Sequence, residues 1–358
     1  MAGMPQQRGL GRVAVVGAGI AGLSCACALR EQGVEVVVFD KGRSPGGRVA
    51  SFRSPELDAD LGAQYFTVRD ERFARCVAAM ERERVVRRWY GRVRAAPVTG
   101  RAFTMTPEVE RYVGVPGMSA IARHLARDLA VRSSHRVDAI AVHARGITLA
   151  GTVGGPGVTL GPREKTDRTL IELGDFDAVL VCLPAEQATA LVAPVSPSLA
   201  EAAGSVRFDP CLALAFATDG TDLEHLPFDG LFVGRDDDRD RAIAWIARDS
   251  SKPGRAGRES WVVHAAPEWS RAHLRDPAEV IERSLLDEMA RLCGRPSIRV
   301  KTATLRRWAF ARAPLALDVH RFFDASTRVG LGGDWCAGGR VEGAFVSGLA
   351  LATSLLDA

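Results

Sequence analysis

The chain has 358 residues, of which 47% are hydrophobic and 25% are charged. This length and composition are sufficient for a large core in one or two domains. The formal net charge of +4 comes almost entirely from arginine, and basic residues alternate with acidic ones, as in residues 81–88 and 235–241. Such alternation is typical of solvated surface, so the sequence indicates no nucleic-acid-binding tract.

The seven cysteines are scattered and odd in number. This usage indicates small buried thiols in a reducing compartment, with no metal site. No segment is long and apolar enough to span a membrane, and no signal peptide precedes the first strand. We therefore expect a soluble cytoplasmic protein that binds neither metal nor membrane; its oligomeric state stays open.

Residues 12–40 have the pattern of a strand–turn–helix–strand unit. An apolar strand is expected over 13–16, a helix over 20–32, and a second strand over 34–39 that ends in the acid Asp40. Asp40 can accept both hydroxyls of a ribose, which favours FAD or NAD over NADP.

The turn of this unit contains Gly17, Gly19 and Gly22 in G-x-G-x-x-G spacing. Gly17 permits the tight turn, Gly19 lets a pyrophosphate approach the backbone, and Gly22 lets helix and strand pack closely. The helix N-terminus supplies N–H groups and positive potential for the phosphates. A dinucleotide site is therefore predicted here.

Further along the chain, the pattern changes from helical to strand-like and back. Helices are expected over 70–86 and after Gly117 and Met118. Strands are expected, in chain order, within 86–97 and at 129–131, 136–142 and 176–183. A loop rich in Gly and Pro interrupts this order at 151–167.

The middle of the chain has short alternating or apolar runs separated by turn signals, which indicate a mostly antiparallel sheet. These runs are 212–217, 231–233, 242–246 and 261–265. A helix is expected over 277–293 with Val280, Leu285 and Met289 facing inward. The C-terminal part then predicts a strand at 329–331 and a helix from Val341 to about Leu356.

Three motifs resemble those of FAD-dependent, amine oxidase-like flavoproteins of the glutathione reductase type. They are GGR at 46–48, DADLGAQYF at 58–66, and GGDW at 332–335 followed by VEGA at 341–344. The resemblance implies that the first two pass close to the pyrophosphate and the flavin, and that Asp334 contacts the ribityl–phosphate region. It also implies that the last helix points its N-terminus at the flavin C2 carbonyl, where helix N–H groups would stabilise the negative charge of reduced flavin.

The predicted fold class is therefore α/β (α+β two-domain). A Rossmann-type FAD-binding domain of the glutathione reductase/p-hydroxybenzoate hydroxylase type is interleaved with a mostly antiparallel substrate domain. The FAD-binding domain is predicted at 1–75, 98–204 and 302–358, and the substrate domain at 76–97 and 205–301. No cysteine lies in the usual setting of a covalent flavin, so noncovalent FAD is expected. The predicted cofactor-binding residues are Gly17, Ala18, Gly19, Ile20, Ala21, Gly22, Asp40, Lys41, Gly47, Arg48, Gly62, Ala63, Gln64, Tyr65, Phe66, Val137, Pro184, Asp334, Val341, Glu342, Gly343 and Ala344.

Nearly the whole chain resembles renalase and its bacterial relatives. The segments that carry the resemblance are DLGAQYFTVRDERF, YVGVPGMSAIARHLA, FDAVLVCLPAEQ, WVVHAAPEWS, LRRWAFARA and GDWCAGGRVEGAFVSGLALA. The resemblance implies oxidation of the 2- and 6-dihydro isomers of NAD(P)H, with hydride transfer to flavin N5, release of NAD(P)+, and reduction of O2 to hydrogen peroxide. Such a substrate is already an activated hydride donor, so positioning would do most of the work.

By resemblance, two residues lie on the substrate face. His264 is expected to hydrogen-bond the substrate and Trp308 to pack on its ring. Without the resemblance, His264 is equally well a satisfied histidine at a strand end, and Trp308 a core residue. Core packing is favoured for Trp245 and Trp261.

Two alternatives stay open. An amine oxidase commonly presents facing aromatic rings and a lysine near flavin N5. The three tyrosines lie outside the C-terminal third of the chain, and Lys252, in a polar Gly/Pro loop, and Lys301, at a strand start, are not obvious matches for that lysine. A flavin-binding protein without turnover is the second alternative, because the cofactor motifs do not distinguish it.

Overall fold

A computed structural model of the chain describes residues 10–96, 103–106, 108–154, 170–218, 223, 225–234, 241–255 and 258–358. The chain forms two compact units, each assembled from separate parts of the sequence. Unit 1 contains residues 1–47, 125–207 and 315–358, and unit 2 contains 48–124 and 208–314.

Unit 1 is built on a six-stranded sheet with the order β19-β20-β13-β1-β2-β9. All neighbours are parallel except β19 and β20. Its strands are β1 (Arg12–Val16), β2 (Glu35–Asp40), β9 (Ala130–Ser133), β13 (Ala178–Val181), β19 (Arg321–Asp324) and β20 (Val329–Gly332). Apart from Arg12 at the start of β1, strands β1, β13 and β20 are apolar and buried, as expected for a parallel sheet covered on both faces.

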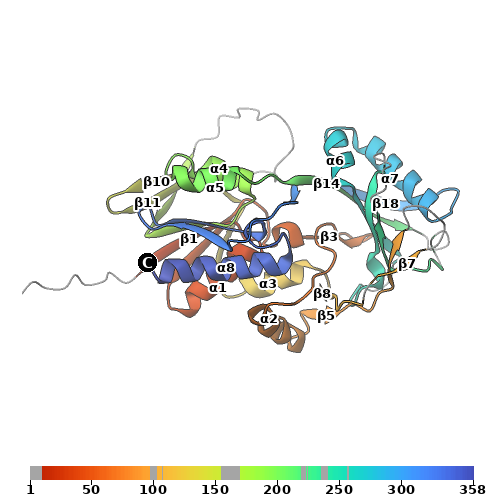
Figure 1. The fold of residues 1–358 in the computed structure, drawn as a ribbon, viewed down its shortest axis with the longest axis horizontal. Helices are drawn as coiled ribbons and strands as arrows, with labels where there is room; N and C mark the ends of the chain where they lie inside the picture. Colours follow the sequence, from red (N-terminus) through yellow and green to blue (C-terminus); the bar gives the residue numbers. More distant parts are fainter. Residues whose placement is uncertain are drawn as a thin grey trace, which may run out of the picture. The chain divides into compact units, whose positions relative to one another are not determined.

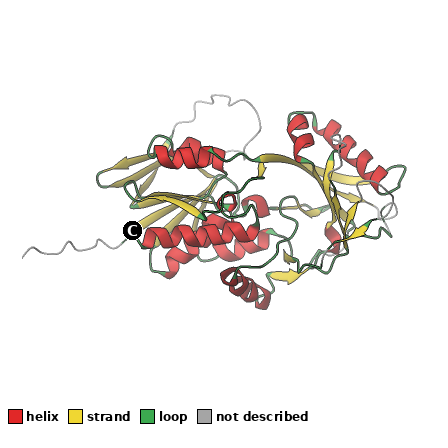
Figure 2. Cartoon of the chain, viewed as in Figure 1, coloured by secondary structure: helices red, strands yellow, loops and turns green. Residues whose placement is uncertain are grey.

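Helices α1 (Ile20–Glu31) and α8 (Val341–Leu356) cover one face of this sheet, as Figures 1 and 2 show. They pack closely because Gly348 has no side chain: a Cβ there would lie 2.1 Å from the Ala21 carbonyl oxygen. The other face carries a small antiparallel sheet and two helices. These elements are β10 (His135–His143), β11 (Gly146–Val153), β12 (Ile171–Phe176), α4 (Ala185–Val192) and α5 (Pro197–Gly204).

Unit 2 is built on a seven-stranded sheet with the order β18-β14-β17-β16-β15-β6-β7. Its neighbours are antiparallel except β15 and β6. The strands are β6 (Val93–Ala96), β7 (Thr104–Met105), β14 (Asp209–Thr218), β15 (Gly230–Val233), β16 (Ile243–Arg248), β17 (Ser260–Ala265) and β18 (Val300–Arg312).

The two faces of this sheet have different coverings because side chains alternate along each strand. One face packs Leu212, Leu214 and Phe216 against helices α6 (Pro267–His273) and α7 (Ala278–Leu292). The other face carries Ala213, Ala215 and Ala217 of the same strand, packed against Leu57, Ala59 and Leu61. The candidate site lies on this second face, where the side chains of β14 are small.

The remaining strands and helices of unit 2 are β3 (Ser51–Arg53), β4 (Asp58–Asp60), α2 (Glu71–Arg82), β5 (Val86–Arg88), β8 (Tyr112–Gly114) and α3 (Ser119–Ala126), whose last residues belong to unit 1. Three short 3-10 turns complete the described elements: η1 (Gly47–Val49) where the chain passes from unit 1 to unit 2, η2 (Asp249–Ser251) in unit 2, and η3 (Asp334–Cys336) in unit 1.

The structure has the predicted fold class, with a Rossmann-like unit and a mostly antiparallel unit. The bounds of the compact units differ from those of the predicted domains, since 48–75, 103–124 and 302–314 belong to unit 2 and 205–207 to unit 1. The physical reason is that Leu57, Ala59 and Leu61 bury their side chains on the second sheet and β18 pairs with β14. The predicted boundary at 97/98 lies outside the described residues.

One inward residue of helix α7 was predicted wrongly. Val280 is 48% exposed, whereas its neighbour Ile281 is fully buried. The buried stripe runs through Ile281, Leu285 and Met289, which follow one another at the four-residue spacing of a helix face.

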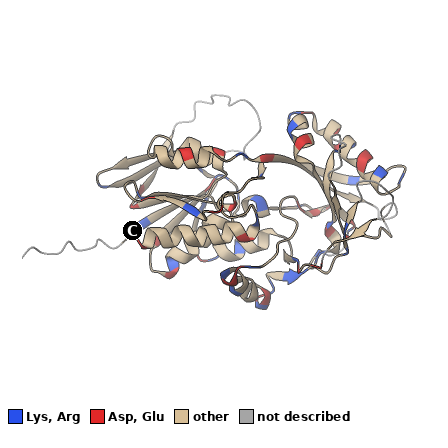
Figure 3. Ribbon diagram, in the orientation of Figure 1, with Lys and Arg blue, Asp and Glu red and all other residues tan. Residues whose placement is uncertain are grey.

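The described residues also show how charged side chains are distributed and whether any helix could cross a membrane. Figure 3 shows Lys and Arg interleaved with Asp and Glu along the ribbon of each unit. Among the helices in the described part of the chain, none combines the length and apolar character needed to cross a bilayer.

Candidate functional site

The predicted cofactor residues of unit 1 gather at one edge of its sheet. Val16 pairs with both Phe39 and Val181, and Val181 pairs with Leu331, so these parallel strands end together. The residues that follow these strand ends within a few positions are Gly17–Gly22, Asp40, Lys41, Pro184 and Asp334. Open parallel sheets bind their ligands at this carboxyl edge.

The glycine turn after β1 has the shape that a bound pyrophosphate requires. Gly17 has φ +109°, and a Cβ there would lie 2.6 Å from the Cys182 carbonyl oxygen. A Cβ on Gly22 would lie 1.9 Å from the Gly17 carbonyl oxygen. Nothing lies within 4 Å of the Cβ position of Gly19, whose backbone is extended. Gly17 and Gly22 are thus needed because a side chain there would clash with the protein backbone, whereas Gly19 leaves open space beside the backbone.

Two helix N-termini at this edge can receive negative charge. Helix α1 begins after Gly19 and helix α8 after Arg340, and neither residue caps its helix through a side-chain hydrogen bond. The first N–H groups of both helices are therefore available to an anion, and the helix dipole adds positive potential. Ile20 and Ala21 open helix α1, and the predicted residues Val341–Ala344 open helix α8.

Asp40 is held beside the glycine turn. Its carboxylate accepts hydrogen bonds from the backbone N–H of Ala18 and of Gly42, both at 2.6 Å. Each carboxylate oxygen has a second lone pair, so Asp40 can still accept ribose hydroxyls. The next residue, Lys41, donates from Nζ to Gln187 Oε1 at 3.0 Å.

The remaining predicted residues of unit 1 lie near this edge or support it. Gly47 approaches the turn, since its Cβ position is 3.6 Å from the Gly19 Cα. Pro184 begins helix α4, and Val137 is a buried residue of β10. Gly343 is required by the chain, because a Cβ there would lie 1.9 Å from the Ala337 carbonyl oxygen.

In unit 2, the predicted residues Arg48, Gly62 and Ala63 meet directly. The Arg48 carbonyl accepts a hydrogen bond from Ala63 N at 2.9 Å. A Cβ on Gly62 would lie 1.9 Å from the same carbonyl oxygen, so only glycine fits at this crossing. The Arg48 guanidinium lies 5.2 Å from the centre of the Phe208 ring.

Gln64 leads into a buried cluster of charged side chains. Its Oε1 accepts a hydrogen bond from Lys252 Nζ at 3.1 Å, and its Nε2 donates to the carbonyls of Asp60 and Gly62. Lys252 is 2% exposed and lies 2.6 Å from Asp249 Oδ1 and 3.5 Å from Asp60 Oδ2. The orientation of the Gln64 amide is thus fixed by a cation on one side and carbonyls on the other.

Charges within this cluster balance. Asp60 and Asp249 are opposed by Lys252 and Arg255, and all four side chains are buried. Burial alone would raise the pKa of Asp60, but the positive charges of Lys252 and Arg255 outweigh it and the pKa is lowered. Asp60 also accepts hydrogen bonds from Ser51 Oγ at 2.6 Å and Met118 N at 2.8 Å, which keep it ionised.

His264 and Trp308 lie on the same face of the unit 2 sheet, because they pair with Ala213 and Cys211 of β14. Trp308 Nε1 donates to the Leu61 oxygen at 2.9 Å, and the Leu61 backbone lies close enough to His264 to affect the pKa of the ring. The two residues come from different strands, β17 and β18, on either side of β14. His264 Nε2 also lies 3.5 Å from Gln64 Nε2, which links this pair to the charged cluster.

His264 is held neutral by its surroundings. Burial, reinforced by the charge of Lys252, lowers its pKa to about 4. The unfolded chain therefore binds a proton at higher pH than the folded protein does. The contribution of His264 to stability is fully present above pH 6.5 and is lost as the pH falls towards 4.

We expect the difference in unfolding free energy between wild type and His264→Asn to shrink by up to about 3 kcal/mol between pH 7 and pH 4, because a pKa shift corresponds to about 1.4 kcal/mol per unit. Urea unfolding of both proteins across this range measures it. His143→Asn, at an exposed position, is the control and should show no such change. A difference that is constant with pH would mean that His264 is not held neutral.

Aromatic rings border the site on the far side of Gln64. The Tyr65 ring lies 6.1 Å from that of Trp89 and 5.8 Å from that of Trp245. Trp245 pairs with His264 across β16 and β17, so their side chains share a face of the sheet. Phe66 instead packs inside the unit, against Phe73 and Tyr112.

Two family profiles match this sequence. Residues 15–79 match a family described as NAD(P)-binding Rossmann-like domain, in agreement with the glycine turn and Asp40. Residues 98–356 match the family described as flavin containing amine oxidoreductase, which is well over half of the chain. The chain belongs to the flavin-containing amine oxidoreductase family. It is accordingly an oxidoreductase of a flavin-dependent class.

The curated proteins that are similar in sequence match only a short part of this chain. Hydroxyneurosporene desaturase of Rubrivivax gelatinosus is 41% identical over 73 residues, which are 20% of this chain and 14% of that protein. The zeta-carotene-forming phytoene desaturase of Myxococcus xanthus is 45% identical over 51 residues, 14% of this chain and 10% of that one. These matches span a small fraction of the curated relatives.

Solved structures share the fold over the full length. A protein from Exiguobacterium sp. 255-15 assigned as a protoporphyrinogen oxidase has a TM-score of 0.74 at 13% identity, with 99% of this chain and 100% of that chain covered. Putrescine oxidase bound to putrescine has a TM-score of 0.68 at 12% identity, with 98% and 100% covered. At such identities the likeness concerns the fold alone.

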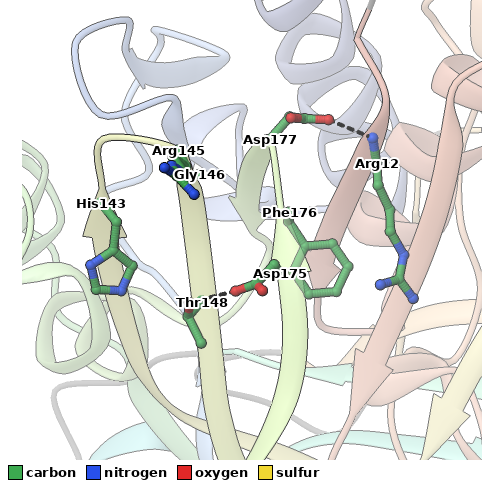
Figure 4. Close-up of a pocket in the computed structure, with 8 residues that line it drawn as sticks. All are labelled: Arg12, His143, Arg145, Gly146, Thr148, Asp175, Phe176 and Asp177. Atoms are coloured by element: carbon green, nitrogen blue, oxygen red, sulfur yellow. Dashed lines mark hydrogen bonds between the residues drawn. The ribbon is translucent and has the colours of Figure 1, made fainter.

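The residues of unit 1 fit the flavin cofactor of this family. The open space at Gly19, two helix N-termini without side-chain caps and the fixed Asp40 carboxylate suit a pyrophosphate and a ribose. The pocket in Figure 4 is a different place: it encloses about 320 Å³ and is lined by Arg12, His143, Arg145, Gly146, Thr148, Asp175, Phe176 and Asp177. It lies where β1 and β13 begin, at the opposite edge of the sheet from the glycine turn.

Sequence reasoning missed the charged cluster and misjudged Lys252. Lys252 does follow a polar stretch rich in small residues, but its side chain is buried beside Gln64. Asp60 lies in the DADLGAQYF motif, but nothing in that motif indicates an ion pair with Lys252, and no local pattern marks Arg255. The one available signal was rarity, since lysine occurs only four times in this chain.

Proposed function

We propose that the protein is a renalase-like oxidase with noncovalent FAD, which oxidises the 2- and/or 6-dihydro isomers of NAD(P)H. The observation that carries this proposal is that His264 and Trp308 lie on one face of the sheet, with the indole fixed by Leu61 and His264 beside Gln64. When bound, FAD would supply the hydride acceptor at N5; the products are NAD(P)+ and, after two electrons and two protons pass to O2, hydrogen peroxide.

Trp308 is suited to hold a flat, neutral ring. Its side chain is half-buried, and its indole is fixed in orientation by the hydrogen bond to Leu61. The strand next to it contributes only the small side chains Cys211 and Ala213 on this face. Arg306 lies over the Trp308 ring, so a dihydropyridine ring could lie against the part of the indole that Arg306 leaves uncovered. Positioning of this kind supplies much of the catalysis for an activated hydride donor.

The electrostatics of the site favour a substrate that needs no deprotonation. An amine arrives mainly as a cation and must lose a proton before it gives up a hydride. His264, with a pKa of about 4, is a weak base for that step. Lys252 donates its hydrogen bonds to Asp249 and Gln64, which hold it in its charged form, so it is not a base for that step either. A dihydronicotinamide ring is neutral and avoids the proton transfer altogether.

An amine oxidase is the second candidate, and Lys252 favours it. Amine oxidases commonly place a lysine near flavin N5. Lys252 is buried and donates to Gln64, and Gln64 belongs to the segment 58–66 that the sequence resemblance puts near the flavin. Tyr65 and Trp245 also supply neighbouring aromatic rings. Family membership is compatible with both candidates.

Anaerobic mixing of the purified yellow protein with 6-dihydroNAD decides between them. We expect rapid loss of the oxidised-flavin absorbance with this isomer, and none with ordinary 4-dihydro NADH or with a panel of primary amines. Subsequent exposure to air should restore the flavin and form hydrogen peroxide. The NAD+ released should equal the flavin reduced.

Other outcomes overturn the proposal. Reduction by an amine, with no reduction by the 2- or 6-dihydro isomers, would assign the protein to the amine oxidases. A flavin that no donor reduces would indicate a flavin-binding protein without turnover.

A further inference from the structure

We propose that Arg306 binds the substrate phosphate that is attached to the nicotinamide ribose. This inference rests on the proposed function and deepens it by naming the residue that gives the substrate much of its affinity. It depends on where Arg306 lies in the sheet, on its contact with Trp308, and on the lack of a carboxylate partner among the residues that the structure describes.

The sheet register places Arg306 on the same face as His264. Ala213 of β14 pairs with His264 on one side and with Arg306 on the other. Directly paired residues of antiparallel strands point to the same face, so the three side chains form one row. Two strand spacings separate the Cα atoms of His264 and Arg306, which is about 10 Å. The neighbouring Arg307 points to the opposite face, where it donates to the Asp276 carbonyl.

Arg306 is held against Trp308. Its guanidinium carbon lies 4.8 Å from the centre of the Trp308 ring, and Trp308 is itself fixed by Leu61. A guanidinium that stacks on an aromatic face keeps its N–H groups in the plane parallel to the ring, free to bind an anion from the side. The contact therefore orients an otherwise flexible side chain next to the predicted ring site.

Arg306 is exposed, and no described side chain forms an ion pair with it. Across the described residues, no carboxylate lies within ion-pair distance of it, in contrast to Lys252 and Arg255 of the same unit, which face Asp249 and Asp60. An unpaired guanidinium beside the site disfavours a cationic substrate and favours an anion. Arginine binds phosphate through two parallel hydrogen bonds.

The chemistry of the substrate fits this spacing. In a nicotinamide nucleotide the first phosphate is attached one ribose away from the ring. A ring held between His264 and Trp308 would therefore have its phosphate within reach of the long Arg306 side chain, two positions before Trp308 on β18. The free dihydropyridine base and simple amines have no such group.

Binding of two oxidised ligands that differ by one phosphate tests the inference. Nicotinamide mononucleotide and nicotinamide riboside are titrated into the flavin-loaded protein, with the flavin spectrum or heat as the signal. We expect Arg306→Gln to weaken binding of the mononucleotide by about ten- to a hundredfold, the usual range for the loss of a hydrogen bond to a charged group. Binding of the riboside should stay unchanged, and Arg306→Lys should restore part of the loss.

Arg283→Gln is the matched control, because Arg283 is an exposed arginine of helix α7, which covers the opposite face of the sheet. It should leave both affinities unchanged. Equal weakening of both ligands by Arg306→Gln would show that Arg306 only supports the ring site, and loss of FAD would show that it serves the cofactor; either result overturns the inference. Failure of the proposed function is recognised separately, because wild-type flavin would then not be reduced by 6-dihydroNAD.

Discussion

Lys252→Met is expected to lower the unfolding free energy by about 3–5 kcal/mol, the usual cost of removing one partner from a buried ion pair. Without Lys252, Asp249 loses its 2.6 Å partner while remaining fully buried, and Arg255 alone must balance two carboxylates. Methionine fills a similar volume, so the loss reflects charge and not a cavity. Urea unfolding at pH 7 measures it.

Two further variants separate charge from packing in this experiment. Lys301→Met changes the same residue type at an exposed position and should alter stability by less than about 0.5 kcal/mol. The double variant Lys252→Met with Asp249→Asn restores the charge balance and should recover part of the lost stability. A loss below about 1 kcal/mol for Lys252→Met would contradict a structural role for the cluster.

The first unit could be predicted from the sequence because its signals are local. The strand, glycine turn, helix and acid of residues 12–40 follow one another, and each is coded by its own few residues. Helix α8 begins at Val341 as predicted. The antiparallel character of the second unit was also predictable, since short alternating runs need only local turn signals.

The centre of unit 2 could not be predicted in this way. The Leu61 carbonyl is a backbone group, and nothing in the sequence shows that Trp308, which is 247 positions away, donates to it. The burial of Lys252 depends on Asp60, which is 192 positions away. Within its own segment, a lysine between serine and proline has the composition of a solvated loop. His264 and Trp308 were identified by resemblance, whereas the contacts that fix them required the fold.

The prediction for helix α7 was wrong by one residue. A helix buries a stripe, and composition alone does not decide between adjacent β-branched residues. Val280 and Ile281 are one position apart, and Ile281 is the one that lies four residues before Leu285 on the buried face. The prediction missed by one position although this four-residue spacing was present in the sequence.

Gly19→Ala and Gly22→Ala are expected to fail in different ways, although both lie in the same turn. A Cβ on Gly22 would lie 1.9 Å from the Gly17 carbonyl oxygen, a backbone atom that cannot rotate away. We expect this variant to lose at least about 3 kcal/mol of unfolding free energy, beyond the usual range for overpacking, and to lose FAD with it.

Gly19→Ala should instead leave the apoprotein as stable as wild type. Nothing lies within 4 Å of its Cβ position, and its φ of −78° suits alanine. The added methyl group would, however, occupy the space that a pyrophosphate needs next to the backbone. Retained flavin absorbance after gel filtration, together with the urea midpoint of the apoprotein, distinguishes the two effects.

Gly204→Ala provides the control for both variants. Gly204 ends helix α5, and its Cβ position meets only Thr189 Cγ2 at 3.9 Å. This change should be neutral or slightly stabilising, because alanine loses less conformational entropy on folding than glycine. If Gly19→Ala kept a full complement of FAD, the open space at the turn would not be the pyrophosphate site. The assignment of the carboxyl edge of the unit 1 sheet to the cofactor would then have to rest on Asp40 and helix α8 alone.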